Sequence, residues 1–381
     1  MRDVVVLGTG QSEFGKLPHI SPIELGRNAV RTAMADAGVV GRDVGAVYAS
    51  RLYNPMITAQ TIMMGLGVTR IEMTNVENGC AGGSTAVRAL YKDIAAGFCD
   101  VGIAVGVESM TTSPIAGKLI PPAADDLGGR LGLAMPVIFA LQSKRLMDTH
   151  GATVEDFATV SVKAHRFGAL NPKAQHRKEL TVDEVLGSRP IADPVTLLQC
   201  CPNTDGAAAV VLASAEFARR HTTTPVRIAG SALVSGDYEE RRTDITTMEL
   251  SKHAATAAYE QAGVAPSDVD VVEVHDAFAC EEIVHYEDLG LCARGDGVAL
   301  LRSGATSLGG RIPVNPSGGL LSLGHPLSAS GVRGVCEIAD QLRGRCGPRQ
   351  VAGATVGLAQ MLGGFASGIE LGAAGVSILT V

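Results

Sequence analysis

The chain has 381 residues, of which 46% are hydrophobic, so it is long enough for two domains or one large composite unit. Its net charge of −7 at neutral pH argues against nucleic acid as a partner, because phosphate binding needs a clustered basic surface. No apolar stretch is long and uninterrupted enough to span a bilayer, and the eight cysteines lack the spacing of metal ligands. We therefore expect a cytoplasmic protein with reduced thiols, without a bound metal and without a membrane span.

The first elements of the chain alternate between strand and helix. The apolar run Val4–Gly8 predicts a buried strand, and because it begins next to the N-terminus we expect no cleavable leader. The segment Ser21–Val39 predicts a helix that is capped by its first serine and ends at Gly38. The segment Val44–Ser50 predicts a second strand. This alternation is typical of an α/β fold with a largely parallel sheet.

Cys80 lies among small residues in the segment Asn75–Gly97, NVENGCAGGSTAVRALYKDIAAG. We expect a strand before the cysteine and a helix after it that ends at Gly97. A thiol at a helix N-terminus is near free N–H groups and the positive end of the dipole, which favour the nucleophilic thiolate. The flanking glycines would let a substrate carbonyl approach and would leave backbone donors for an oxyanion. The spacing alone fits a small buried thiol of the core equally well.

The stretch 111–190 interrupts the pattern with prolines, paired glycines and the polar run Lys163–Leu180, KAHRFGALNPKAQHRKEL. We expect a mostly helical and loop excursion that covers the core. The Lys, Arg and His side chains of the polar run could meet an anionic ligand, or they could form a solvated basic helix face.

A histidine motif follows in Val271–Leu291, VVEVHDAFACEEIVHYEDLGL. The apolar VVEV predicts a buried strand, so His275 and Asp276 lie at a strand end, where α/β folds place their sites. A single histidine is more often structural, but a His-Asp pair at a strand end favours a function.

A second histidine motif is Asn315–Arg333, NPSGGLLSLGHPLSASGVR, in which His325 stands in a glycine-rich loop just before a predicted helix. As a general base, His325 would withdraw the proton from the Cys80 thiol. The segment Val356–Leu371, VGLAQMLGGFASGIEL, predicts a strand, a glycine-rich turn and a strand, which could wall the site or form only a tight hairpin.

The chain also repeats itself. The segment that begins at Glu24 matches the segment that begins at Glu249 at a constant offset of 225 positions, and both contain an AGV helix end followed by a DV strand entry. We interpret this as a duplicated α/β unit with one half over residues 1–215, including the excursion, and the other over 226–381. A second alignment places GCAGGSTAVRAL opposite GHPLSASGVRGV, and it predicts a pseudo-twofold axis that relates two helix N-termini.

These motifs, in this order and over the whole chain, resemble the thiolase superfamily. NGCAGGSTAV resembles its nucleophile segment, GVESMTTSP its GMESMS-type segment, and NPSGGLLSLGHPLSASG is similar to its NxxGGxxxxGHPxGxSG signature. HDAF at His275–Phe278 and CCPNTDGAAAVVLAS at Cys200–Ser214 resemble the sterol-carrier-protein-type and archaeal-type members. The resemblance implies the thiolase fold, with two duplicated α/β halves in five αβαβα layers and a loop domain over the active site.

The resemblance also implies roles for the candidate residues. Cys80 would be acylated by an acyl-CoA, His325 would activate it, and His275 would help hold the thioester oxygen of the second substrate. The backbone N–H groups of Cys80 and Gly364 would form an oxyanion hole. A coenzyme A thioester would be the substrate, with no permanently bound cofactor, and no residue is assigned to hold the coenzyme.

One departure from the family pattern concerns the second cysteine that thiolases use as acid and base. Met361 stands where a C-x-G motif usually places this thiol, and Ala277 stands where the sterol-carrier-protein type has HDCF. Gln360 replaces a histidine that is frequent in HDAF relatives, and we expect no site role for Cys280.

The predicted function is therefore that of an acyltransferase of the acetyl-CoA acetyltransferase type in lipid metabolism. It would carry out thiolysis or Claisen condensation of 3-ketoacyl-CoA through acyl-Cys80. The alternatives are a specialised C-acyltransferase, a decarboxylative condensing enzyme or an aldolase-type relative, and, from another class, a non-catalytic scaffold subunit. The resemblance implies a homodimer or tetramer and a small OB-fold companion protein.

Overall fold

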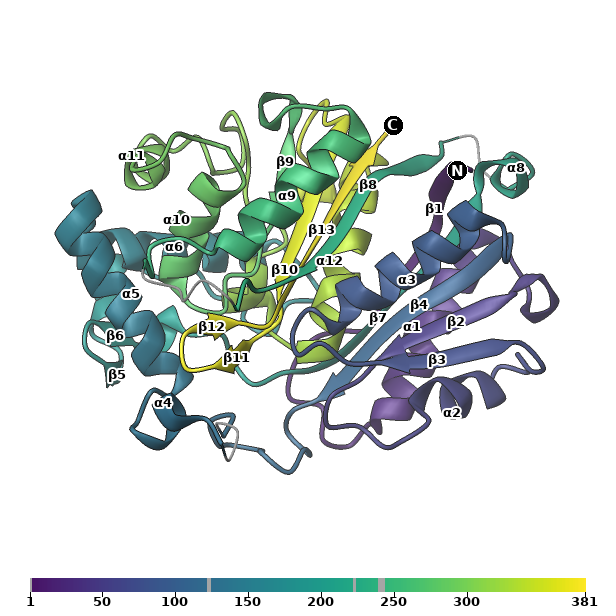
Figure 1. Cartoon of the computed structure of the whole chain (residues 1–381), viewed down its shortest axis with the longest axis horizontal. Helices are drawn as coiled ribbons and strands as arrows, with labels where there is room; N and C mark the ends of the chain where they lie inside the picture. The colour runs from purple at the N-terminus through teal and green to yellow at the C-terminus, as the bar shows by residue number, and fades with distance from the viewer. Residues whose placement is uncertain (1, 122–124, 222–223, 239–243) are drawn as a thin grey trace.

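The computed structural model describes residues 2–121, 125–221, 224–238 and 244–381, and Figure 1 shows how they are arranged. The longer strands are β1 (Val4–Gln11), β2 (Ala46–Ser50), β3 (Glu72–Val76), β4 (Val101–Ser109), β7 (Asp205–Ser214), β8 (Val226–Ser235), β9 (Val271–Glu273), β10 (Val356–Leu362) and β13 (Ala373–Thr380). Within the described ranges they form one hydrogen-bonded sheet in the order β3-β2-β4-β7-β1-β8-β13-β10-β9. Two small hairpins pair β5 (Pro190–Ala192) with β6 (Val195–Thr196) and β11 (Phe365–Ser367) with β12 (Glu370–Leu371).

The helices cover both faces of this sheet. They are α1 (Pro22–Ala37), α2 (Thr58–Met64), α3 (Gly82–Ala96), α4 (Leu127–Arg130), α5 (Met135–His150), α6 (Val154–Ala169), α7 (Val182–Leu186), α8 (Ala215–Ala218), α9 (Glu249–Ala262), α10 (Ala279–Asp288), α11 (Gly297–Arg302) and α12 (Leu327–Leu342). Short helical turns are η1 (Gly41–Asp43), η2 (Leu197–Gln199), η3 (Pro266–Asp268), η4 (Gly319–Leu323) and η5 (Gly347–Arg349). No helix within the described residues is both long and apolar enough to cross a membrane.

The strand order shows the predicted duplication. The order β2-β4-β7-β1 in one half is repeated as β9-β10-β13-β8 in the other, and the two halves meet where β1 and β8 pair. This antiparallel junction consists of only two residue pairs, Val5 with Arg227 and Val6 with Val226. Equivalent turns keep the offset seen in the sequence, because η1 begins at residue 41 and η3 at residue 266.

The sheet is mixed, and the prediction of a largely parallel sheet was wrong. Parallel pairing joins β2 to β3 and β4, and β9 to β10, whereas β7 and β13 run antiparallel to both of their neighbours. In each half the last strand, β7 or β13, lies between two strands that run in the opposite direction. The N-terminal pattern of strand, helix and strand does not reveal this arrangement, because these strands lie far along the chain.

The layers are those of a five-layer αβαβα arrangement. Helix α1 buries its apolar side against the strands of the first half, in a core that includes Val30 and Val211. Helix α9 packs in the same way against the second half. Helices α3 and α12 lie between the two halves and share one core, where Leu90 and Val335 are buried.

Small residues bring α3 and α12 close together. A Cβ atom placed on Gly331 would lie 2.4 Å from the backbone nitrogen of Ser84, and one on Gly83 would lie 2.7 Å from that of Val332. Real Cβ contacts are never this short, so both positions need glycine. The N-terminal parts of the two helices are therefore in contact, and they are the helix starts that the second sequence alignment related by a pseudo-twofold axis.

The excursion after β4 is helical, with α4, α5, α6 and α7, and residues 122–124 of it lie outside the described residues. Figure 1 shows α5 and α6 beside α10 and α11, on the flank of the second half. Helix α6 contacts η4, the turn that precedes His325. Lys163 of the polar run is buried and donates to Glu282 Oε1 at 2.5 Å, so at this position the run is neither solvated nor free for a ligand.

The C-terminal segment forms the predicted strand, glycine-rich connection and strand, with Gly363 and Gly364 between β10 and β11, but these two strands do not pair as a hairpin. Strand β10 is present, but the next residues form the small β11–β12 hairpin, and the strand that pairs with β10 is β13, which begins at Ala373. The β11–β12 hairpin lies at the sheet end near α4 (Figure 1).

Candidate active site

Cys80 stands in the turn that joins β3 to α3. Two backbone hydrogen bonds close this turn, from Ala81 N to Asn78 O at 3.0 Å and from Gly82 N to Gly79 O at 3.1 Å. Gly79 has φ +54°, a left-handed conformation that glycine adopts without strain. Cys80 is 5% exposed and precedes the first turn of α3, so its sulfur lies at the positive end of that helix.

His325 occupies the corresponding place in the second half, just before α12. Its backbone N–H donates to Thr204 Oγ1 at 3.1 Å, and its Nδ1 lies 2.8 Å from Ser330 Oγ. The Ser330 hydroxyl itself donates to Pro326 O at 3.1 Å, so it can only accept from the imidazole. The proton of a neutral His325 is therefore on Nδ1, and Nε2 carries a lone pair.

His275 follows β9 and is held from two sides. Its backbone N–H donates to Gln360 Oε1 at 2.9 Å, and its Nδ1 lies 3.1 Å from Glu281 Oε1. The carboxylate of Glu281 also accepts the backbone N–H of Phe278 at 3.0 Å, at the start of α10. Because a carboxylate only accepts, it orients the Nδ1–H of His275 toward itself.

The three predicted side chains come together. One ligand atom each from Cys80, His275 and His325 lies within 4.8 Å of the other two. The imidazole rings of the two histidines meet edge to face, with centroids 5.3 Å apart and an interplanar angle of 81°. Both Nε2 atoms are buried and have no hydrogen-bond partner within the described residues. The Nδ1 atoms are occupied, so the Nε2 atoms are the ones free to serve the sulfur or a substrate.

The two imidazoles have opposite electrostatic environments. Burial, the positive charge of His275 and that of Arg333 hold the pKa of His325 well below its usual range. Burial alone would lower the pKa of His275 too, but the Glu281 carboxylate and Cys80 outweigh it and raise this pKa to about 10. At neutral pH the site therefore holds a neutral imidazole and an imidazolium on either side of one thiol.

The Gly363–Gly364 segment lies next to the Cys80 turn, and Gly363 is the residue whose backbone contacts this turn. A Cβ atom on Gly363 would lie 2.4 Å from Asn78 O, and one on Gly79 would lie 3.4 Å from the carbonyl carbon of Gly363. The end of β10 and the nucleophile turn therefore touch backbone to backbone. This close approach places the Gly363–Gly364 segment at the edge of the site.

Apolar side chains, called here the apolar wall, also pack around Cys80. Cys80 shares a small cluster with Met110, Ile115 and Leu327, and Leu52, Tyr53 and Ile120 pack against it. Part of this wall comes from the excursion after β4, as expected for a segment that covers the site.

Glu108 is a buried residue beside this wall that sequence reasoning did not single out. Its carboxylate accepts the backbone N–H groups of Leu52 and Tyr53 at 3.0 and 3.1 Å and the hydroxyl of Ser328 at 2.8 Å. Burial raises its pKa to about 7. It thus connects the wall to the first turn of α12, and the only sequence sign was its place in GVESMTTSP.

Met361, Gln360 and Cys280, which the sequence comparison with the family pattern singled out, are all buried. Met361 is 2% exposed and packs in the core of the second half, and the side-chain amide of Gln360 lies between His275 N and Ser251 Oγ. The Cys280 sulfur lies 3.6 Å from Phe139 O and 3.3 Å from Gln142 Oε1, away from the three site residues.

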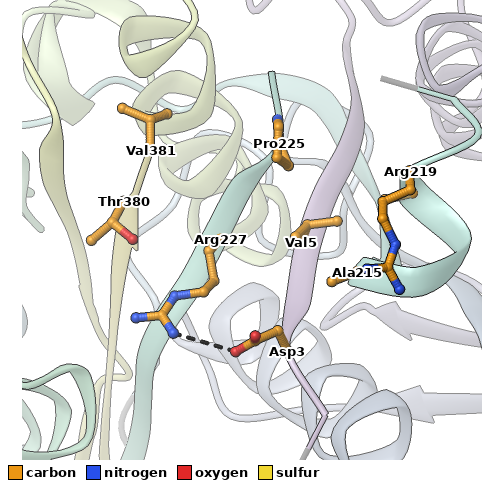
Figure 2. A pocket seen from close by; sticks show the side chains of 9 residues that line it. Asp3, Val5, Ala215, Arg219, Pro225, Arg227, Thr380 and Val381 are labelled. Atoms are coloured by element: carbon orange, nitrogen blue, oxygen red, sulfur yellow. Dashed lines mark hydrogen bonds and ion pairs between the residues drawn. The ribbon is translucent and has the colours of Figure 1, made fainter. Parts of the chain in front are cut away.

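Two open cavities lie elsewhere on the molecule. One of about 470 Å³ occupies the junction of the two halves, where Asp3 of the first half meets Arg227 of β8 (Figure 2). Another of about 410 Å³ is lined by Lys16, Lys173 and Arg177, so part of the polar run does face an open groove that could take an anion. Neither contains a predicted site residue.

Comparison with known proteins gives a consistent result. The family model described as "Thiolase, N-terminal domain" matches residues 4–216, and "Thiolase C-terminal domain-like" matches residues 231–375. An acetyl-CoA acetyltransferase of Methanothermobacter thermautotrophicus is 40% identical over 371 residues, which cover 96% of this chain and 97% of the relative. Benzoylsuccinyl-CoA thiolase subunit BbsB of Thauera aromatica is 37% identical over 353 residues, 92% of this chain and 91% of that protein.

Two further relatives extend the comparison. Sterol carrier protein 2 of Bos taurus is 37% identical over 379 residues, which cover 94% of this chain and 70% of that protein. The solved structure of an Ltp2-ChsH2(DUF35) aldolase superposes with a TM-score of 0.87 at 26% identity and covers 100% of this chain and 98% of that one. Since both halves match thiolase models and the relatives align over nearly the whole length, this chain belongs to the thiolase family.

Proposed function

We propose that this protein is an acyl-CoA acyltransferase of the acetyl-CoA acetyltransferase type and that it forms an acyl-Cys80 intermediate. The observation that carries the proposal is the meeting of one thiol with two imidazoles of opposite protonation. Such a site can both deprotonate a nucleophile and stabilise the anion that its attack creates. A scaffold subunit would need neither property.

The first step is attack on the thioester. His325 Nε2 takes the proton of the Cys80 thiol while its Nδ1–H stays bound to Ser330 Oγ. The thiolate attacks the carbonyl carbon of the acyl-CoA, and a tetrahedral intermediate with a negative oxygen forms. When this intermediate collapses, the bond to the coenzyme sulfur breaks, and the imidazolium of His325 returns the proton to the departing thiolate.

The oxyanions need donors that are already in place. His275 keeps both ring protons at neutral pH and binds Glu281 through Nδ1, so its Nε2–H is available to a substrate oxygen. The backbone N–H groups of Cys80 and of Gly364 are the other donors that we assign to this task. In a buried site such preoriented donors stabilise a developing charge far more than water-exposed donors do.

The surroundings of Cys80 fit an acyl chain. Met110, Ile115 and Leu327 are nearly fully buried around the sulfur and offer only apolar atoms and a thioether. The acyl group of the intermediate would lie against them, out of contact with water that could hydrolyse the thioester.

The relatives support the finer parts of this proposal. The acetyl-CoA acetyltransferase and the benzoylsuccinyl-CoA thiolase subunit are named for reactions of CoA thioesters, and we infer that this chain also uses a CoA thioester in lipid metabolism. We further propose a cytoplasmic homodimer or tetramer, with no permanently bound cofactor. The name of the solved aldolase pairs Ltp2 with ChsH2(DUF35), which supports a small companion protein here as well.

Intact-mass measurement after incubation with acetyl-CoA tests the proposal. We expect wild-type protein to gain the mass of one acetyl group, and Cys80→Ser and His325→Ala to gain none on the same time scale. Cys99→Ala is the matched control, because Cys99 is a partly exposed thiol outside the site, and it should label like wild type. Wild-type protein that stays unlabelled would disprove the acyl-enzyme, and labelling without thiolysis of acetoacetyl-CoA would favour a specialised acyltransferase or aldolase relative.

A further inference from the structure

Breaking or making the carbon–carbon bond next to a thioester needs an acid that gives, or a base that takes, a proton at the α-carbon. The side chains to which the proposed function gives a task beside Cys80 do not supply this group. His325 serves the sulfur, His275 is held as an imidazolium by Glu281, and Met361 and Ala277 have no proton to exchange. The proposed function therefore lacks one group.

A second cysteine lies between the two histidine loops. Cys200 forms an antiparallel bridge with Phe278, and Asn203 forms a parallel bridge with His325. Between these contacts, the backbone N–H of Cys201 donates to Ala277 O at 2.8 Å. The segment Cys200–Asn203 therefore runs from one histidine loop to the other, and Cys201 is fixed directly beside the residue that follows His275 and Asp276.

The surroundings of Cys201 point toward the site. Burial raises the pKa of its thiol well above the usual range, and the neighbouring sulfur of Cys80 and the carboxylate of Glu281 raise it further, as does Cys200. Cys80 and Glu281, which also act on His275, are thus among the groups that set the pKa of Cys201. Cys201 is only partly buried, whereas Cys80 is buried.

The site also has unsatisfied polar atoms where a substrate would sit. The Nε2 atoms of His275 and His325 belong to side chains that are 2% and 3% exposed, and neither has a hydrogen-bond partner within the described ranges. Buried donors and acceptors of this kind are normally paired, so a ligand group is expected between them. Cys201 belongs to the backbone segment that contacts both histidine loops.

We propose that Cys201 is the acid and base at the α-carbon of the substrate in this site. In the direction of thiolysis, Cys80 adds to the 3-keto carbon, the bond between carbons 2 and 3 breaks, and carbon 2 takes its electron pair. Cys201 gives its thiol proton to this carbon, which yields acetyl-CoA and a Cys201 thiolate. Incoming coenzyme A returns a proton to Cys201 and attacks acyl-Cys80, which releases acyl-CoA and the Cys80 thiolate. Condensation runs through the same steps in reverse.

The proposal rests on the acyl-enzyme, so the test measures the two halves of the reaction separately. The first readout is acetylation of Cys80 by acetyl-CoA, followed by intact mass. The second is uptake of deuterium at the α-carbon of acetyl-CoA in D₂O, together with thiolysis of acetoacetyl-CoA. We expect Cys201→Ala to acetylate within about threefold of the wild-type rate and to lose deuterium uptake and thiolysis by at least ~100-fold.

Cys200→Ala is the matched control. Cys200 is the adjacent thiol, and its sulfur lies 3.5 Å from Thr196 O, which is not a site residue. This variant should keep both readouts within about threefold. Cys201→Ser, which keeps the shape but is a far weaker acid, should behave like Cys201→Ala.

The outcomes separate the two hypotheses. If wild-type protein does not acetylate, the proposed function itself fails. If wild-type protein acetylates but exchanges no α-proton, or if Cys201→Ala retains exchange and thiolysis, the role of Cys201 is refuted while the acyl-enzyme stands. Equal losses in Cys200→Ala would show that the segment matters only for structure, and would also refute the role.

Discussion

The Glu281–His275 pair offers the sharpest test of the site's electrostatics. The proposed mechanism needs His275 as an imidazolium, and its Nδ1 lies 3.1 Å from Glu281 Oε1. Glu281→Gln removes the negative charge and keeps the size and one acceptor oxygen. That oxygen can still accept the Phe278 N–H that starts α10, so the fold of the loop should persist.

The size of the effect follows from the geometry. At 3.1 Å and an effective dielectric constant of ~20, the attraction between the two charges is about 5 kcal/mol. Each pKa unit corresponds to ~1.4 kcal/mol, so the loss of this attraction is enough to bring the pKa of His275 from about 10 to below 7. A neutral imidazole is a weaker donor to an oxyanion than an imidazolium, and we expect kcat at pH 8 to fall ~10- to 100-fold with little change in KM.

The pH dependence gives a second readout with a definite sign. In the wild type the activity that needs the imidazolium is present at lower pH and is lost as pH rises through about 10. In Glu281→Gln this alkaline limb of the pH–rate profile should move below pH 7. The raised pKa also predicts that the contribution of His275 to the free energy of unfolding is complete below 6.5 and is lost between 6.5 and about 10. Steady-state rates and denaturant titrations across this range measure both effects.

Glu282→Gln controls for general damage to α10. Glu282 is the next buried carboxylate on the helix, but it pairs with Lys163, so its loss should lower thermal stability without moving the alkaline limb. An alkaline limb in Glu281→Gln that coincides with the wild-type limb, with kcat within twofold, would refute the assignment of His275 as a charged donor.

Three further predictions concern other parts of the site and core. Ser330→Ala removes the acceptor that fixes the proton of His325 on Nδ1, so the rate of Cys80 acetylation should fall ~10-fold at unchanged melting temperature, and a loss below twofold would contradict this. Gly331→Val places carbon against the first turn of α3 and should cost about 1–3 kcal/mol in a thermal melt, whereas Gly15→Ala, with no atom within 4 Å of its Cβ, should be nearly silent. Met110→Ala opens the apolar wall beside the sulfur, so kcat/KM for hexanoyl-CoA relative to acetyl-CoA should rise ~10-fold, and a fall in this ratio would show that the acyl chain lies elsewhere.

The duplicated architecture could be predicted because its signals are local. The AGV helix ends and DV strand entries recur at one offset, and in the structure η1 and η3 and strands β2 and β9 keep that offset. The encounter of Cys80 with His325 followed from the same logic, since both stand before helices that the duplication relates. The assignment of β7 and β13 to antiparallel positions did not follow, because pairing between distant strands leaves no local pattern.

The residues that contact the site side chains could not be predicted from local sequence patterns. Glu281 was visible in HDAFACEE, but nothing in the spacing shows that its carboxylate turns back to His275. Glu108 and the segment of Cys201 act through contacts with residues far along the chain, so only the folded geometry reveals them. Sequence reasoning found the three side chains that lie together, whereas their buried partners come from other elements of the fold.

The two histidines have opposite protonation because they occupy different places in the duplicated fold. Cys80 and His325 both precede a central helix, and the positive end of a helix favours a thiolate and disfavours an imidazolium. For His325 this acts in the same direction as burial, His275 and Arg333, which hold its pKa well below the usual range. His275 comes instead from a strand end, next to the Glu281 carboxylate, so it holds a positive charge at neutral pH, which His325 would carry only while it holds the Cys80 proton. In the proposed mechanism, a duplicated helix start thus supplies the attack on the thioester, and the strand end supplies the charge that stabilises its product.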